Sequence, residues 1–249
     1  MSSQAKKQPR IFNMATFPAR IYSFADAVNS ILPQCDRLNI YLNQYDHIPD
    51  FLIHPKINAV LSGNEMGNLG DVGKFFWCDQ WTEGYIFTVD DKFIYPADYA
   101  SMLIYKVEEY DRKAVVSCHG RILEIPCTSY YNQCKEFFGL LGTVRKDTFA
   151  HELGTGAMCF HTDTLMGCNL SLDIFPRANM TDIYFSMFLQ KHRIPILIAR
   201  HSAGWTLLNT KHDESYSIHN TFNHSGKDQP QTDLVNSFDW MIHEPVSAH

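Results

Sequence analysis

Two adjacent carboxylates follow an apolar segment and offer the sharpest chemical pattern in the sequence. Residues 85–89 predict a strand, and Asp90, Asp91 and Lys92 come directly after it. Neighbouring carboxylates repel each other unless a cation or hydrogen-bond donors lie between them. A divalent ion is one solution, and such ions are often shared with substrate phosphates. The alternative is a solvated turn, because Asp is common after strands.

A glycine-rich segment lies upstream of these acids. Residues 68–74 contain Gly70, Asp71 and Gly73 and end at Lys74. Glycines let backbone N–H groups approach a phosphate, and a lysine adds positive charge. The spacing lacks the full pattern of a P-loop. On its own, the segment is better explained as a flexible loop.

Three later positions could also carry chemistry. Gly154 and Gly156 flank Thr155, and such a pair permits either close backbone approach to a ligand or a plain turn. Asp182 lies near the start of a predicted helix, where an acid is also a common cap. His201 follows a predicted strand, and a lone histidine is more often structural than a ligand.

These residues depend on elements that place them at one edge of a sheet. Apolar runs predict strands over 11–16, 38–42, 57–61, 85–89, 114–117, 157–160 and 194–199. Helical spacing predicts helices over 21–32, 96–110, 180–191 and 231–241. The segment 120–147 has weak periodicity and supports no prediction, and 209–231 is polar enough for a long loop.

Alternating strands and helices predict an α/β fold, with a Rossmann-like, mostly parallel central sheet and helices on both faces. In such sheets the ligand crevice lies at the carboxyl ends of the strands. The 249 residues, 45% of them apolar, fit one domain over 11–249 after a flexible, polar segment 1–10. We expect residues 11–95 and 96–205 to form its two halves, followed by a loop and helix over 206–249.

Composition excludes several classes of protein. The net charge of −6 gives no general basic surface for nucleic acid. An odd count of seven cysteines without a C-x-x-C pair favours reduced thiols. The polar N-terminus has no signal-peptide core, and no apolar run reaches 18 residues. We therefore expect a cytoplasmic protein, with peripheral attachment at the inner face of the membrane left open.

The order of these patterns along the chain resembles that of the inverting glycosyltransferases of family 2, which have the GT-A fold. The resemblance runs from about Ile11 to Trp205. It rests on residues 14–20, 68–75, 87–96, 153–164 and 180–191, and on His201. It implies transfer of a sugar from a nucleoside diphosphate sugar, most often a UDP-sugar, to a saccharide or glycolipid acceptor with inversion. Such enzymes commonly act in cell-surface polysaccharide or lipopolysaccharide synthesis.

The resemblance also implies a role for each matching residue. The nucleotide and donor contacts would be Thr16, Phe17, Arg20, Asp71, Lys74, Asp90 and Asp91. Gly154, Thr155 and Gly156 would shape the acceptor side, and Asp182 would be the general base. Asp91 and His201 would bind Mn²⁺ or Mg²⁺. The sequence departs from the family at Lys92, where members often carry a third acid or an amide; a cation there could repel a metal or pair with diphosphate directly.

Two other functions remain open at this stage. A nucleotidyltransferase could have a similar sheet and acidic site, and it would release pyrophosphate. A non-catalytic protein could bind a nucleotide sugar without transferring it, which Lys92 makes plausible. Aromatic residues could stack on sugar faces in any of these proteins, and the candidates are Trp77, Trp81, Tyr130 and Tyr131.

Overall fold

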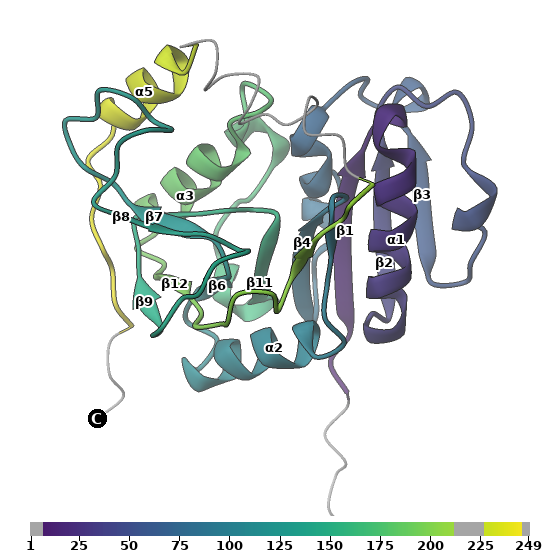
Figure 1. Cartoon of the computed structure of the whole chain (residues 1–249), viewed down its shortest axis with the longest axis horizontal. Helices are drawn as coiled ribbons and strands as arrows, with labels where there is room; N and C mark the ends of the chain where they lie inside the picture. The colour runs from purple at the N-terminus through teal and green to yellow at the C-terminus, as the bar shows by residue number, and fades with distance from the viewer. Residues whose placement is uncertain (1–6, 212–226, 246–249) are drawn as a thin grey trace, which may run out of the picture.

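A large mixed sheet forms the centre of the molecule (Figure 1). The computed structural model describes residues 7–211 and 227–245. In spatial order the strands are β3 (Ile57–Leu61), β2 (Arg37–Leu42), β1 (Arg10–Thr16), β4 (Tyr85–Asp90), β11 (Ala157–His161), β6 (Val115–Ser117), β12 (Ile196–Ile198) and β9 (Thr148–Phe149). All seven predicted strands lie in this sheet, and it joins strands from both predicted halves of the chain.

Most neighbouring strands are parallel, as predicted. β1 pairs in parallel with β2 and β4, β2 with β3, and β6 with β12. β11 is antiparallel to both β4 and β6, and β9 is antiparallel to β12. The register shows how β11 is reversed: its first residue, Ala157, pairs with Val89 at the carboxyl end of β4. The segment before β11 therefore lies beside Asp90, and the chain returns through the sheet from there.

Helices cover both faces of the sheet. Residues of α1 (Ile21–Ile31) and α2 (Tyr99–Glu109) share one buried cluster with Phe87 and Val89 of β4. Residues of α3 (Thr181–Lys191) share a second cluster with Ile86. The alternation along β4 is the period of two expected of a strand buried on both faces. These contacts confirm the predicted helices and place α3 on the face away from α1 and α2.

The segment with weak periodicity forms very short strands. β7 (Gly120–Ile122), β8 (Glu136–Phe138) and β10 (Glu152–Leu153) make a three-stranded antiparallel sheet. A separate two-stranded sheet pairs β5 (Phe93–Ile94), just after the acidic strand end, with β13 (Leu207–Leu208). Strands of two or three residues are too short to show a hydrophobic period, which explains why the sequence supports no prediction there.

The final helix starts earlier and ends earlier than predicted. α5 spans Gln229–Asn236, whereas the sequence predicts 231–241. Most of the predicted polar loop, 212–226, lies outside the described residues, as does 1–6 of the N-terminal segment. All seven cysteines are free thiols, as expected. Within the described ranges, no helix combines the length and apolar character that crossing a bilayer requires.

Candidate functional site

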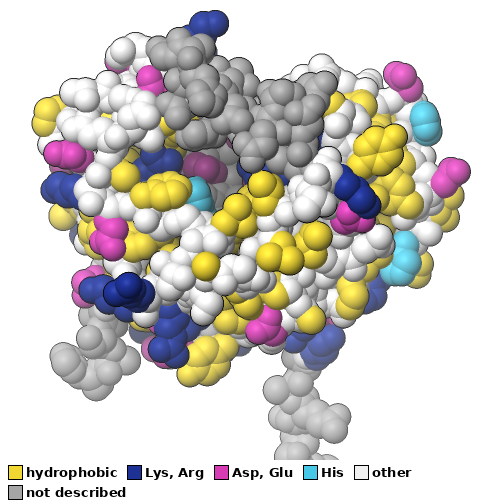
Figure 2. All heavy atoms as spheres, in the orientation of Figure 1, with side chains coloured by type: hydrophobic (Ala, Val, Ile, Leu, Met, Phe, Trp, Pro, Cys, Tyr) yellow, Lys and Arg dark blue, Asp and Glu magenta, His cyan; other side chains and the backbone are white. Residues whose placement is uncertain are grey.

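A cavity of about 900 Å³ opens at the carboxyl end of β4 and contains most of the predicted site residues. Those that line it are Thr16, Phe17, Arg20, Asp71, Lys74, Asp90, Gly154, Thr155, Gly156 and Asp182. Figure 2 shows charged side chains and a histidine gathered around a hollow on this face of the molecule. The structure therefore brings together residues from five separate segments of the chain, at the edge where a mostly parallel sheet is expected to bind its ligand.

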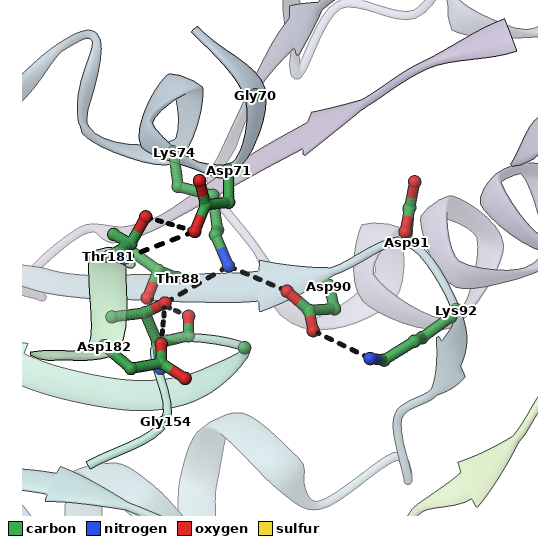
Figure 3. A network of polar contacts seen from close by, with 12 residues as sticks. Gly70, Asp71, Lys74, Thr88, Asp90, Asp91, Lys92, Gly154, Thr181 and Asp182 are labelled. Carbon is green, nitrogen blue, oxygen red and sulfur yellow. Dashed lines mark hydrogen bonds and ion pairs between the residues drawn. The ribbon is translucent and has the colours of Figure 1, made fainter. Parts of the chain in front are cut away.

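Each of the two strand-end acids is paired with a cation. Lys74 Nζ lies 2.8 Å from Asp90 Oδ1, and Lys92 Nζ lies 3.7 Å from Asp90 Oδ2 (Figure 3). Arg20 Nη1 donates a hydrogen bond of 2.7 Å to Asp91 Oδ1. The side chains of Lys74 and Asp91 are only 6% and 1% exposed, so these charges depend on each other for compensation.

The cations keep Asp90 ionised despite its burial. Burial acts to raise its pKa, but the ammonium groups of Lys74 and Lys92 outweigh that effect and hold the pKa well below its usual value. Burial likewise acts to lower the pKa of Lys74, and Asp90 and Asp182 reverse the shift and raise it. Both groups are therefore charged at neutral pH, and the strand end presents fixed charges to the cavity.

The two glycines of the 154–156 segment make room for side chains. A Cβ at Gly156 would lie 2.4 Å from Asp90 Oδ2, and a Cβ at Gly154 would lie 2.2 Å from a ring carbon of His119. Neither distance is compatible with a normal van der Waals contact. The two glycines therefore make room for Asp90 and His119 of the same chain, and their approach to a ligand stays a prediction.

Thr155 joins the strand end to α3. Its hydroxyl donates a hydrogen bond of 2.6 Å to Asp182 Oδ1, its backbone N–H donates one of 2.8 Å to the same atom, and its Oγ1 accepts one of 3.3 Å from Lys74 Nζ. Asp90, Lys74, Thr155 and Asp182 form one continuous network. Figure 3 shows Lys74 between Asp90 and Asp182. Both bonds of Asp182 end on Oδ1, and among the described residues no donor is bonded to Oδ2.

The start of α3 is capped by Asp71. Its carboxylate accepts hydrogen bonds from the backbone N–H of Asn179 at 2.6 Å, from that of Thr181 at 3.4 Å, and from the Thr181 hydroxyl. These bonds satisfy donors that a helix N-terminus leaves free. Asp182 is thus not needed as the cap, which was the alternative to a chemical role. Asp71 lines the cavity as predicted, and its contact with a nucleotide stays a prediction.

The residues expected to hold a metal do not lie in a metal-binding arrangement. His201 Nδ1 is 2.9 Å from the carbonyl oxygen of Ala199, and its Nε2 is 3.4 Å from that of Gly139. Asp91 Oδ1 is bonded to Arg20. Across residues 7–211 and 227–245, no three His, Cys, Asp or Glu side chains form a group that could bind an ion. A bound divalent ion stays a prediction that these contacts fit poorly.

The sequence analysis missed three polar residues near Thr155, namely His119, Arg121 and Glu152, and it named their neighbour Tyr130 only as a stacking candidate. His119, Arg121 and Tyr130 line the cavity, and Glu152 lies behind them. Burial lowers the pKa of His119 to about 4 and raises that of Glu152 to about 7. The Tyr130 hydroxyl donates a hydrogen bond to Glu152, and the Arg121 guanidinium lies 4.3 Å from the centre of the Tyr130 ring. Arg121 and Glu152 lie in strands of three and two residues and His119 lies between two strands, so no hydrophobic period in the sequence revealed these three residues.

Helix α5 supports the wall that carries the tyrosines. Thr232 Oγ1 accepts a hydrogen bond of 3.0 Å from the backbone of Tyr130, and Asn236 makes two bonds to the backbone of Cys127. Tyr130 and Tyr131 therefore line the cavity, as the stacking hypothesis requires. Trp81 lines a separate, smaller cavity, and Trp77 is buried.

The fold and the site define an α/β protein with a cavity at the end of β4 that is lined by charged, polar and aromatic side chains. No model of a known protein family matches the sequence, and no curated protein matches it either. The function must therefore be argued from the cavity itself.

Proposed function

We propose that the protein is an inverting glycosyltransferase of the GT-A type. Its donor is a nucleoside diphosphate sugar, and UDP is the nucleotide that we propose. The observation that carries the proposal is the network from Asp90 through Lys74 and Thr155 to Asp182. It joins a strand end with several cations to a carboxylate that has one oxygen without a bonded donor among the described residues. The cations would stabilise the charge of a leaving diphosphate, and the carboxylate of Asp182 would take the proton of an attacking hydroxyl.

The donor would bind on the side of β1 and β4. Thr16, Phe17 and Arg20 line the cavity there, and the Arg20 guanidinium lies 4.8 Å from the centre of the Phe17 ring. Phe17 offers an aromatic face to a base, and Lys74 and Lys92 offer ammonium groups to the diphosphate. Charge-assisted hydrogen bonds of this kind are about twice as strong as neutral ones.

The acceptor would bind between Thr155 and the tyrosines. Tyr130, Tyr131 and Phe137 supply aromatic faces for a sugar ring. His119 is neutral at physiological pH because its pKa is about 4, so it can accept or donate a hydrogen bond to a hydroxyl without adding charge. A saccharide or the saccharide part of a glycolipid suits this mixture of aromatic and polar groups.

The reaction requires one bond to form and one to break. A lone pair of the acceptor hydroxyl oxygen forms a bond to the anomeric carbon of the donor. The bond between that carbon and the diphosphate oxygen breaks, and its electron pair leaves with the diphosphate. Asp182 Oδ2 takes the hydroxyl proton. A single displacement of this kind inverts the anomeric configuration.

The proposal is tested by incubating the protein with UDP-, GDP- and dTDP-sugars and a panel of saccharide acceptors. Glycosyl transfer releases a nucleoside diphosphate, which an enzyme-coupled assay detects, and mass spectrometry identifies the extended acceptor. Release of pyrophosphate from a nucleoside triphosphate and a sugar phosphate would instead identify a nucleotidyltransferase. Tight donor binding without hydrolysis or transfer on any acceptor would identify a binding protein.

A further inference from the structure

Three cations contact the two carboxylates of the strand end. Arg20, Lys74 and Lys92 stand against the two carboxylates of Asp90 and Asp91. Lys74 and Lys92 flank the same carboxylate, and both line the cavity. Asp182 and Asp71 also stabilise the charge of Lys74, whereas the ion pair of Lys92 is with the Asp90 carboxylate that it shares with Lys74. Lys92 is therefore the cation whose charge an anion entering the cavity would compensate most directly.

A divalent ion would have to compete with these cations for ligands. Both oxygens of Asp90 face ammonium groups, at 2.8 and 3.7 Å. Asp91 is fully buried, its Oδ1 is bonded to Arg20, and its Oδ2 has no hydrogen-bond partner among the described residues and no contact with solvent. Hard divalent ions need several accessible oxygen ligands. Among the described residues, neither Asp90 nor Asp91 thus offers such an ion a carboxylate oxygen that is both exposed to the cavity and clear of a cation.

Lys92 is the cation best placed to change partners. Its ammonium lies 3.7 Å from Asp90, beyond a normal hydrogen bond, and its side chain is 25% exposed. Lys74 is held more tightly, by Asp90 at 2.8 Å and by Thr155 at 3.3 Å. Lys92 can therefore reach for a phosphate while Lys74 stays on Asp90.

We propose that Lys92, together with Lys74, neutralises the diphosphate of the donor in place of a divalent cation. This inference rests on the proposed function. In the transfer step the electron pair of the broken bond between sugar carbon and oxygen moves to the diphosphate, whose added charge meets two fixed ammonium groups. Binding and transfer then proceed without added metal.

Calorimetry of UDP binding to EDTA-treated protein tests the proposal, with and without added Mn²⁺. We expect the UDP affinities with and without Mn²⁺ to agree within about twofold, because Lys74 and Lys92 would contact the diphosphate in both conditions. Lys92→Gln should weaken UDP binding about tenfold or more, as expected for loss of a charge-assisted bond. Lys113→Gln is the matched control, because Lys113 pairs with Asp111 near the surface and should leave the affinity unchanged.

Lys92→Asp tests whether the positive charge of residue 92 takes the place of a metal ion. It supplies a third carboxylate, so we expect its UDP affinity to be low in EDTA and to recover on addition of Mn²⁺. If wild-type protein binds UDP only when Mn²⁺ is present, the inference is wrong and the proposed function stands. If UDP, GDP and dTDP all fail to bind under both conditions, the proposed function itself is wrong. Thermal melting of each variant shows whether it is folded.

Discussion

The Thr155 hydroxyl points its proton at Asp182 Oδ1, 2.6 Å away, while its oxygen faces the Lys74 ammonium at 3.3 Å. One side chain thus orients the carboxylate that we propose as the base and contacts the cation that we place at the diphosphate. A substitution at Asp182 should therefore alter the surroundings of Lys74, and a substitution at Lys74 should alter those of Asp182.

The first prediction concerns the proposed base. Asp182→Asn keeps an oxygen that can accept the two bonds from Thr155, but it removes the ability to take a proton. We expect turnover to fall about a hundredfold to ten-thousandfold, with donor affinity and melting temperature close to wild type. Steady-state kinetics, donor calorimetry and thermal melting measure the three quantities. Near-normal turnover on the true acceptor would remove Asp182 from the mechanism.

The second prediction concerns the Thr155 hydroxyl, which connects Asp182 to Lys74. Thr155→Val removes the hydroxyl, leaves the backbone bond to Asp182 and conserves volume. We expect turnover to fall roughly tenfold because the carboxylate loses one of its two orienting bonds. Thr155→Ser is the matched control, because it keeps the hydroxyl. Equal turnover in the Val and Ser variants would show that the hydroxyl has no part in the reaction.

The third prediction concerns the space that Gly156 leaves for Asp90. In Gly156→Ala the new Cβ would lie 2.4 Å from Asp90 Oδ2, so the carboxylate must move away from Lys92 or Lys74. We expect donor affinity to fall by about tenfold or more, the usual effect of disturbing a charge-assisted pair. Gly63→Ala is the control, because a Cβ there meets nothing within 4 Å. Calorimetry with UDP on both variants decides the matter, and an unchanged affinity in Gly156→Ala would contradict the prediction.

The fourth prediction separates two roles for Asp71. Asp71→Ala leaves the Asn179 and Thr181 donors without their acceptor, and we expect the free energy of unfolding to fall by about 1–3 kcal/mol. Chemical denaturation measures this loss. A variant that unfolds like the wild type but binds UDP much more weakly would instead make Asp71 a direct nucleotide contact.

The fifth prediction is a dependence of stability on pH. Burial raises the pKa of Glu152 from 4.5 to about 7, with Arg121 and Tyr130 acting in the opposite direction. Its neutral form is therefore favoured in the folded protein. The stability that Glu152 contributes is complete below about pH 4.5 and is lost as the pH rises through about 7.

Glu152→Gln isolates this contribution, because Gln can still accept the Tyr130 hydrogen bond and does not titrate. Between pH 5 and 8, the free energy of unfolding of the wild type should fall relative to that of the variant, by on the order of 3 kcal/mol. The comparison must be relative because His119, whose pKa is lowered to about 4, acts in the opposite direction as the pH falls below about 6.5. A constant difference across this range would contradict the prediction.

The sequence predicted the central sheet well because its long strands are strongly apolar and end at recognisable turns. It also placed Lys74, Asp90, Thr155 and Asp182 among the site residues. It did not predict the direction of β11, since an apolar strand has the same pattern either way. The pairing of Arg20 with Asp91 was equally hidden, because the two residues are 71 positions apart and meet only when β1 and β4 are neighbours.

The contacts of helix α5 determine the order in which the two sides of the cavity form. Asn236 bonds to Cys127 across 109 positions and Thr232 to Tyr130 across 102, so residues 127–130 gain these partners only after the helix has been synthesised. The strands β1 to β4 and their cations are synthesised well before α5, and contacts between such distant segments form late because loop closure is entropically costly. A nascent chain would therefore complete the side of its cavity formed by β1 and β4 first, and the wall with Tyr130 would close only after α5 has left the ribosome.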